Sequence, residues 1–399
     1  MSVVELLQMP VLIPALLLLG YLALLSILAL VGRHLPPPAA KEIRRLAIVV
    51  PAHNEELTIE RTVGSLKKLE YPAGKFSVTV IADNCTDTTA ALARQAGVDV
   101  LERRNETERG KGYALRWAID RLLKTVPEQE AFIVIDADTE AAPDFLRVVN
   151  EYLDAGAQVV QSSDMVRPQP EAWSAEMTRI GFTLYNHARP LGRSMLGGSA
   201  GLRGNGMCFR ASVMRAHPWD AFSRAEDLEF GLMLLLEGIS VTFAPEARVI
   251  ATMPLQAHNA VSQRTRWEGG RLPLIRSYAG RLFKNSILHG SYSCFDALMD
   301  LVTPPVVTTL VAALGFAVVN LGLAAAGVPG TAWCAVLWSC VVVLGLTHLF
   351  VGLKASGADR GQYEALRHLP RYATWKLGVY ARRILGAREH EWVRTTRES

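Results

Sequence analysis

The stretch FIVIDADTE, residues 132–140, joins an apolar run to two aspartates one residue apart, Asp136 and Asp138. Two neighbouring carboxylates repel each other unless a cation lies between or above them. At the end of a strand, where the chain turns, both can reach one hard cation. Mg²⁺ or Mn²⁺ binds one or two protein carboxylates and completes its shell with phosphate and water oxygens. The stretch therefore predicts a strand that ends in a metal and phosphate site.

The sequence around this stretch repeats the pattern of an apolar run followed by a polar turn. Residues 45–55 and 76–84 read as strands, residues 98–103 read as a shorter one, and segments with helical spacing lie between them. Strands that alternate with helices imply a parallel sheet covered on both faces, with ligands at the carboxyl ends of its strands. Polar residues follow three of these strands: His53, Asn54 and Glu55, then Asp83 and Asn84, then Asp136 and Asp138.

The pattern is less regular after residue 144. AQVVQSS (157–163) predicts another strand, and ISVTFAP (239–245) and ARVIAT (247–252) predict two short ones. The glycine-rich stretch 197–206 fits a mobile loop over an acceptor and fits ordinary turns equally well.

Three uncharged apolar runs, at residues 9–32, 302–327 and 331–353, account for much of the 50% hydrophobic content. A membrane-spanning helix needs roughly 20 apolar residues, and each run is long enough. A cleaved signal peptide fits the first run poorly, because the preceding residues carry only Glu5 and no basic residue. A buried helical hairpin is the alternative for the later two runs, but their length and lack of charge disfavour it.

Lysine and arginine residues near the ends of these runs predict their orientation. They follow the first run, precede the second and follow the third, whereas the link between the last two runs is uncharged. We therefore expect a multi-pass protein of the cell (inner) membrane with its middle and tail in the cytoplasm. The net charge of +4 is modest, so the basic residues favour lipid headgroups and not nucleic acid. Five scattered cysteines without a CxxC pair make a zinc site or disulfide framework improbable.

These observations predict the domain organisation. The chain divides into an N-terminal transmembrane helix (1–33), a proline-rich basic linker (34–45), a cytoplasmic catalytic domain (46–270), an amphipathic interface segment (271–300), two transmembrane helices (301–353) and a cytoplasmic interfacial tail (354–399).

Two further motifs carry candidate chemistry. Glu226 and Asp227 open an apolar helix. One interpretation is that these acidic residues simply stabilise the helix terminus. The other is that Asp227 accepts a proton from a substrate hydroxyl. In QRTRW (263–267), Gln263 and Trp267 share one helix face and Arg266 can bind phosphate oxygens through its two-pronged guanidinium. Taken alone, this second motif is explained as well by an interfacial helix with ordinary Arg and Trp anchors.

An apolar strand followed by Asp-x-Asp also occurs in haloacid-dehalogenase-type phosphatases, where the first aspartate is the nucleophile. That motif normally places a threonine two residues after the second aspartate and lies on the first strand. Here Thr139 follows Asp138 directly and the strand is the fourth, which disfavours a phosphohydrolase.

The motifs PAHNE, ADNCTD, GKG, DAD, ED and QxxRW occur together in the order shown by membrane-bound family 2 glycosyltransferases. The chain resembles these enzymes from about Arg45 to Trp267, and the flanking apolar segments and the closing GAREHEWVRTTR (386–397) resemble their exopolysaccharide-synthesising members, which include hyaluronan- and cellulose-synthase-like enzymes. The resemblance implies an α/β fold of the GT-A type, with a Rossmann-like nucleotide-binding sheet, three transmembrane helices and amphipathic interface helices. Asn84 departs from the Asp-Asp that many members have at positions 83–84.

The resemblance also implies roles for individual residues. Ala52 and Glu55 would lie by the uridine, Asp83 near the base and Lys111 near the nucleotide. Asp136 would contact the sugar nucleotide, Asp138 would bind Mg²⁺ or Mn²⁺, and Asp227, with Glu226 beside it, would be the catalytic base. The diphosphate and the acceptor would be held by Gln263, Arg266 and Trp267.

The function that follows is an inverting, metal-dependent transfer of a sugar from a nucleoside-diphosphate sugar, with UDP favoured, to a polysaccharide or lipid acceptor. Other polysaccharide-synthesis or export subunits are possible partners, together with the lipid bilayer. The count of three predicted spans is lower than in many polymer-extruding members. Single-sugar transfer to a lipid, as in ceramide- or hopanoid-glycosyltransferases, is therefore an open alternative. A phosphohydrolase and a non-catalytic assembly subunit fit the motifs less well.

Overall fold

A computed structural model describes residues 2–253 and 257–384 of the chain, without the side chains of residues 257–268, 377 and 379–384. The chain forms two compact units. The first unit, called here the helical unit, comprises the described residues 2–33, 168–195 and 299–384. The second, called the sheet unit, comprises residues 34–167, 196–253 and 257–298.

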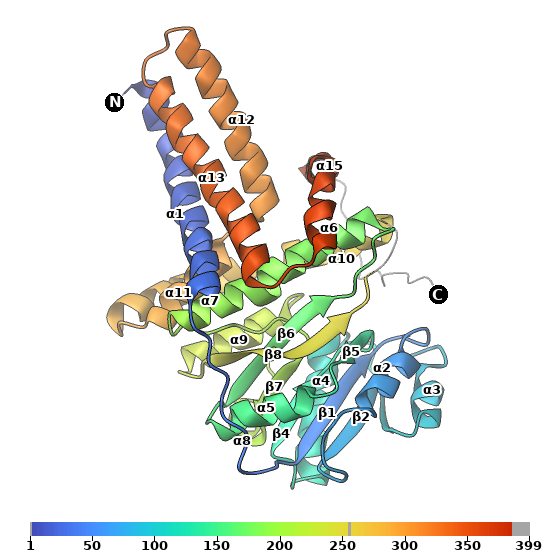
Figure 1. The fold of residues 1–399 in the computed structure, drawn as a ribbon. Helices are drawn as coiled ribbons and strands as arrows, with labels where there is room; N and C mark the ends of the chain where they lie inside the picture. Colours follow the sequence, from blue (N-terminus) through green and yellow to red (C-terminus); the bar gives the residue numbers. More distant parts are fainter. Residues whose placement is uncertain (1, 254–256, 385–399) are drawn as a thin grey trace. The chain divides into compact units, whose positions relative to one another are not determined.

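One sheet with the strand order β3-β2-β1-β4-β7-β6-β8-β5 forms the centre of the sheet unit (Figure 1). The strands β3, β2, β1 and β4 run parallel to one another, as the sequence predicts. The other half is mixed, because β7 is antiparallel to both β4 and β6, and β5 is antiparallel to β8. The strand bounds are β1 Leu46–Ala52, β2 Phe76–Asp83, β3 Asp99–Arg103, β4 Ala131–Val134, β5 Thr139–Ala141, β6 Val159–Val166, β7 Met207–Arg210 and β8 Val241–Ala251.

Helices cover this sheet and connect its strands. Alternate residues of β1, such as Ile48 and Val50, are buried in one core with Val63 of α2 and Val149 of α5. This alternation follows from the period of two along a strand, and it shows that α2 and α5 cover the same face. The helices of the sheet unit are α2 Ile59–Leu66, α3 Thr89–Gln95, α4 Lys111–Thr125, α5 Phe145–Asp154, α8 Ala211–Ala216, α9 Glu226–Leu236 and α10 Ala257–Leu288; α11, Tyr292–Val302, crosses the boundary between the units.

The two short strands predicted at 239–245 and 247–252 are one strand, β8. β8 runs beside β6 with a register shift, so that Ser162 pairs with Ala244 whereas Ser163 pairs with Arg248. Three residues of β8, beginning with Pro245, therefore have no opposite residue on β6. Proline cannot donate a backbone hydrogen bond, and a bulge at this point lets the strand continue past it.

Three helices of the helical unit, α1 (Val3–Val31), α12 (Val306–Ala325) and α13 (Thr331–Ala355), are long and apolar enough to cross a membrane. They pack side by side around Leu12, Leu19, Trp338 and Val341 (Figure 1). A Cβ at Gly345 would lie 2.4 Å from a methyl carbon of Leu310 and 2.8 Å from one of Leu19. A residue without a side chain at this point therefore lets the three helices approach closely, as is common inside membranes.

A buried polar cluster joins the same three helices. The side-chain amides of Gln8 and Asn320 exchange two hydrogen bonds of 3.0 Å, and the indole N–H of Trp338 donates to Oε1 of Gln8 at 2.7 Å. Within a membrane such bonds contribute about 0.6 kcal/mol each to helix association. The remaining elements of this unit are α6 Trp173–Phe182, the π-helix η1 Thr183–Ala188, α7 Arg189–Met195, α14 Arg360–Ala365, the 3₁₀ helix η2 Leu366–His368 and α15 Leu369–Ile384.

Candidate active site

The carboxyl ends of the parallel strands β1 and β2 bring the first two groups of predicted site residues together. Ala52 ends β1 one register step from Asp83 at the end of β2. Nδ1 of His53 donates to the backbone oxygen of Asp83 at 2.7 Å. Glu55 lies on the next turn, where its backbone N–H donates to Thr89 Oγ1 at 2.7 Å. The predicted nucleotide residues Ala52, Glu55 and Asp83 thus lie on one edge of the sheet.

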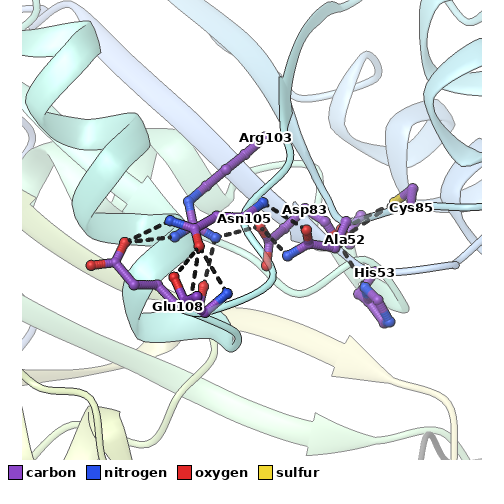
Figure 2. Close-up of polar contacts among 9 residues, drawn as sticks. Ala52, His53, Asp83, Cys85, Arg103, Asn105 and Glu108 are labelled. Atoms are coloured by element: carbon purple, nitrogen blue, oxygen red, sulfur yellow. Dashed lines mark hydrogen bonds and ion pairs between the residues drawn. The ribbon is translucent and has the colours of Figure 1, made fainter.

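The Asp83 carboxylate lies in a buried ion pair with Arg103, the last residue of β3 (Figure 2). Nη1 of Arg103 lies 2.8 Å from Oδ1 of Asp83, and both side chains are below 10% exposed. Arg103 also donates to the backbone oxygen and to the carboxylate of Glu108. The sequence identified Asp83 but not its partner, because the last residue of a short edge strand carries no signal of its own.

The two aspartates of the opening stretch follow β4 and differ in exposure. The side chain of Asp136 is 37% exposed and pairs with Lys111, whereas Asp138 is 9% exposed. Thr139 donates from Oγ1 to Oδ1 of Asp138 at 3.1 Å. Within the described residues no group of three or more metal-binding side chains is assembled. Two carboxylates suit a site that Mg²⁺ or Mn²⁺ shares with the phosphates of a substrate, because such ions retain non-protein ligands.

Lys111 joins the strand ends to the first turn of α9. Its ammonium pairs with Asp136 and also donates to the backbone oxygen of Gly204. Burial alone would lower the pKa of Lys111, but the negative charges of Asp136, Glu226 and Asp227 raise it above the ordinary value. One partly buried cation therefore interacts with the carboxylates after β4 and with those at the start of α9.

Asn205 is the centre of a buried hydrogen-bond network behind Asp136. Its Oδ1 accepts from the backbone N–H of Asp136 at 3.1 Å, and its Nδ2 donates to Thr139 and to Asp164, both at 3.0 Å. The backbone oxygen of Asn205 accepts from Gln161 at 2.8 Å. The network fixes the backbone from which Asp136 projects.

The glycines beside Asn205 are required by close packing. Gly204 has a φ of 86°, and a Cβ there would lie 3.1 Å from Oδ2 of Asp227. Gly206 has a φ of 64°, and its Cβ would lie 1.8 Å from Oγ of Ser162. At both positions any other residue would strain the left-handed backbone and displace a neighbouring side chain. This end of the glycine-rich stretch is therefore a packed turn that carries Asn205.

Glu226 and Asp227 open α9 and are partly buried. Burial raises the pKa of both carboxyls, and the repulsion between them adds to the shift of Glu226, whose pKa reaches about 7. Lys111 opposes this shift in both residues, and backbone N–H groups at the start of the helix also lower the pKa of Asp227. A partly buried carboxylate with a raised pKa suits proton transfer near neutral pH.

The raised pKa of Glu226 predicts a pH-dependent effect on stability. The folded state favours protonated Glu226, so its stabilising contribution is complete below about pH 4 and is lost as the pH rises through about 7. With divalent metals chelated, Glu226→Gln should raise the free energy of unfolding by about 3 kcal/mol at about pH 8.5 and by less than about 1 kcal/mol at about pH 5. Thermal unfolding of the purified chain at both values measures this. The exposed Glu237→Gln, at the other end of α9, is the control; an equal effect of Glu226→Gln at both values would contradict the prediction.

The structure gathers Lys111, Asp136, Glu226 and Asp227 around one charge network, and it places Ala52, Glu55 and Asp83 along the adjoining strand ends. Asp138 lies near the same network, since its charge and that of Asp136 both act on Asp164. The third predicted group, Gln263, Arg266 and Trp267, lies on α10, and its side chains are outside the described part of the structure.

Sequence reasoning missed Arg103, Asp164 and Asn205. Asp164 is 3% exposed on β6, and burial together with the charge of Asp136 raises its pKa well above the ordinary value. A signal for it existed, because residues 161–164 of this buried strand are all polar. Asn205 lies in the glycine-rich stretch, which indicated either a turn or a mobile loop.

A half-parallel, half-mixed sheet with acidic residues at the ends of its parallel strands is the arrangement of the GT-A class of glycosyltransferases, and this is the fold that the sequence predicts. Residues 44–270 match the family described as "Glycosyltransferase like family 2". The match covers more than half of the chain, which therefore belongs to this family.

Curated relatives with assigned names include enzymes of glycolipid synthesis. The chain is 28% identical over 290 residues to the beta-monoglucosyldiacylglycerol synthase of Nostoc sp., an alignment that covers 69% of this chain and 59% of the relative. The synthase of the same name from Synechocystis sp. is 29% identical over 57% of this chain and 48% of its own length. The chain thus spans about half to three fifths of these relatives.

Among solved structures, the fold resembles that of the mannosyltransferase PcManGT from Pyrobaculum calidifontis, determined in complex with GDP-Man and Mn²⁺. The TM-score is 0.52 at 18% identity, and the similarity covers 84% of this chain and 95% of that protein. At this identity the similarity concerns the fold.

Proposed function

We propose that this chain is an inverting glycosyltransferase that transfers one sugar from a UDP-sugar to a lipid hydroxyl at a membrane. The observation that carries the proposal is the position of Lys111, which pairs with Asp136 and also interacts with the charges of Glu226 and Asp227. Sugar transfer needs a cation and a carboxylate close together. Negative charge develops on the diphosphate leaving group, and the attacking hydroxyl loses a proton.

Asp138, assisted by Asp136, would hold Mg²⁺ or Mn²⁺ with the diphosphate. The metal would supply charge neutralisation for the leaving phosphate. Asp227 would take the proton of the acceptor hydroxyl as its oxygen bonds to the anomeric carbon and the bond from that carbon to the phosphate oxygen breaks. Lys111 would attract the diphosphate, and Ala52, Glu55 and Asp83 would hold the nucleoside. Gln263, Arg266 and Trp267 remain predicted contacts of the diphosphate and the acceptor.

The acceptor proposal is supported by the named relatives and by the three apolar helices of the chain. Two named relatives form a glucosyl lipid, and helices of this length suit an acceptor that resides in a bilayer. The basic residues near the ends of these helices support a protein of the cell (inner) membrane whose sheet unit lies in the cytoplasm. A polysaccharide product, with further synthesis or export subunits, is the second candidate; similarity to the glucomannan 4-beta-mannosyltransferase 1 of Oryza sativa subsp. japonica, at 22% identity, favours it.

The test uses the full chain in nanodiscs that contain diacylglycerol or ceramide. Each of UDP-glucose, UDP-galactose, UDP-N-acetylglucosamine and GDP-mannose is added with Mg²⁺ or Mn²⁺, and both nucleotide release and product mass are measured. We expect UDP release in step with a lipid that carries one sugar. A long polymer would favour the second candidate, and phosphate release from a simple phosphomonoester without any acceptor would contradict a transferase.

A further inference from the structure

The two oxygens of the Asp83 carboxylate have different surroundings. Oδ1 accepts one hydrogen bond from Nη1 of Arg103 at 2.8 Å and one from Nδ2 of Asn84 at 3.2 Å. Within the described residues Oδ2 accepts no hydrogen bond, and the side chain keeps 9% of its surface exposed. A carboxylate oxygen offers about two acceptor positions. Oδ1 is therefore filled by the protein, and Oδ2 is the oxygen that can accept a donor from a ligand.

Arg103 is held where it is by the loop that follows β3 (Figure 2). Its Nη1 also donates to the backbone oxygen of Glu108 at 2.8 Å, and its Nη2 donates to Oε2 of Glu108 at 3.2 Å. Asn105 donates to the same Oε2 at 3.0 Å, which fixes the Glu108 carboxylate in turn. With its side chain 4% exposed and three bonds made, Arg103 has little freedom to release Oδ1 of Asp83.

Asn84 is fixed in the same way. Its backbone adopts a φ of 51°, which asparagine tolerates better than most residues. Its Oδ1 accepts from the backbone N–H of Asn105 at 2.8 Å, which leaves its Nδ2 directed at Asp83. Both donors to Oδ1 are thus anchored to the loop that follows β3, residues 104–108.

The pattern of one filled and one open oxygen discriminates between nucleobases. Guanine presents two adjacent donors, N1–H and the 2-amino group, which match both oxygens of a carboxylate. Uracil presents one ring donor, N3–H, which needs a single oxygen. Cytosine and adenine present an unprotonated ring nitrogen at this edge, which a carboxylate repels. An Asp83 whose Oδ1 is already filled fits uracil best.

We infer that Arg103 is a positioning residue that makes the site selective for uracil, by filling one oxygen of Asp83 and orienting the other. This inference rests on the proposed function, in which Asp83 lies at the nucleobase, and it adds the residue that sets the choice of base. Arg103 itself need not touch the nucleotide.

The test measures binding and does not depend on transfer. The full chain in nanodiscs is titrated with UDP, GDP, CDP and ADP in the presence of Mg²⁺, by isothermal calorimetry. We expect the wild type to bind UDP at least about 10-fold more tightly than GDP. Arg103→Met should weaken UDP binding by about 10-fold or more and bring UDP and GDP to within about 3-fold of each other. Arg104→Met removes the same charge from the neighbouring exposed residue and should preserve the wild-type ratio.

Arg103→Lys serves where Arg103→Met does not fold, as judged by circular dichroism. It keeps the buried positive charge. One ammonium, however, cannot hold Asp83 together with the backbone oxygen and Oε2 of Glu108 in the same geometry. It should therefore reduce the preference for UDP over GDP in the same direction. Three results would overturn the inference: a folded Arg103 variant that keeps the wild-type ratio of affinities, a variant that loses affinity for all four nucleotides equally, or a wild type that prefers GDP. Each would still be compatible with a nucleotide-sugar transferase. A wild type that binds none of the four would overturn the proposed function as well.

Discussion

We expect Asp227→Asn to lower the turnover number for sugar transfer by about 10²–10⁴-fold, the range typical of the loss of a general base. The amide has the shape of the carboxylate but cannot take a proton from the acceptor hydroxyl. Asp227 is partly buried at the start of α9, and desolvation raises its pKa above the ordinary value, which makes the carboxylate a better proton acceptor. The dissociation constant of the nucleotide should change little, because the proposed nucleoside contacts lie on the ends of β1 and β2.

The measurement compares the turnover number from nucleotide release with the dissociation constant for UDP, in the full chain in nanodiscs. Glu237→Gln makes a similar change at the exposed far end of α9 and should leave both values as in the wild type. Transfer at the wild-type rate by Asp227→Asn would assign the base to another residue. A parallel loss of UDP binding would instead indicate that Asp227 supports the nucleotide site.

Asp138→Asn should abolish metal-dependent transfer, with a loss of activity of at least about 10²-fold. Even residues that merely orient metal ligands weaken metal binding by about 10–100-fold when they are replaced, so the loss of a direct carboxylate ligand should be at least as large. Unlike Asp227→Asn, this variant should also weaken UDP binding in the presence of Mg²⁺ or Mn²⁺, because the metal joins the diphosphate to the protein.

Titration of Mn²⁺ against activity and against UDP binding tests the role of Asp138. The half-saturating Mn²⁺ concentration should rise in Asp138→Asn, whereas Asp99→Asn, an exposed aspartate at the start of β3, should behave as the wild type. Wild-type UDP affinity and an unchanged Mn²⁺ requirement in Asp138→Asn would remove this residue from the metal site.

The parallel half of the sheet was predictable because its signals are local. Each strand is a short apolar run bounded by polar turns, and parallel order follows from the helices between the strands. The three apolar helices were predictable for a similar reason, since length and hydropathy alone set the ability to cross a membrane. The mixed half was less predictable. In particular, the sequence around Pro245 predicted two short strands, whereas a bulge makes them the single strand β8.

The division of the chain into units could not be read from the order of its residues. Residues 168–195 lie between strands of the sheet unit in the sequence but pack with the helical unit. Their burial depends on partners distant in the sequence, such as Ala365 and Leu349, which pack with Met177 and Leu184. No local pattern specifies such partners.

The sequence by itself determined the class of the protein and most of its candidate site. Carboxylates at the ends of apolar strands have no role in a core, so Asp83, Asp136 and Asp138 stood out without any structure. Only the tertiary structure decided how those carboxylates are paired, because it brings Lys111 to Asp136 and within reach of the charge of Asp227, and it pairs Asp83 with Arg103. The physical reason is that charge interactions act over a few ångströms in space, and spacing along the chain carries little information about them.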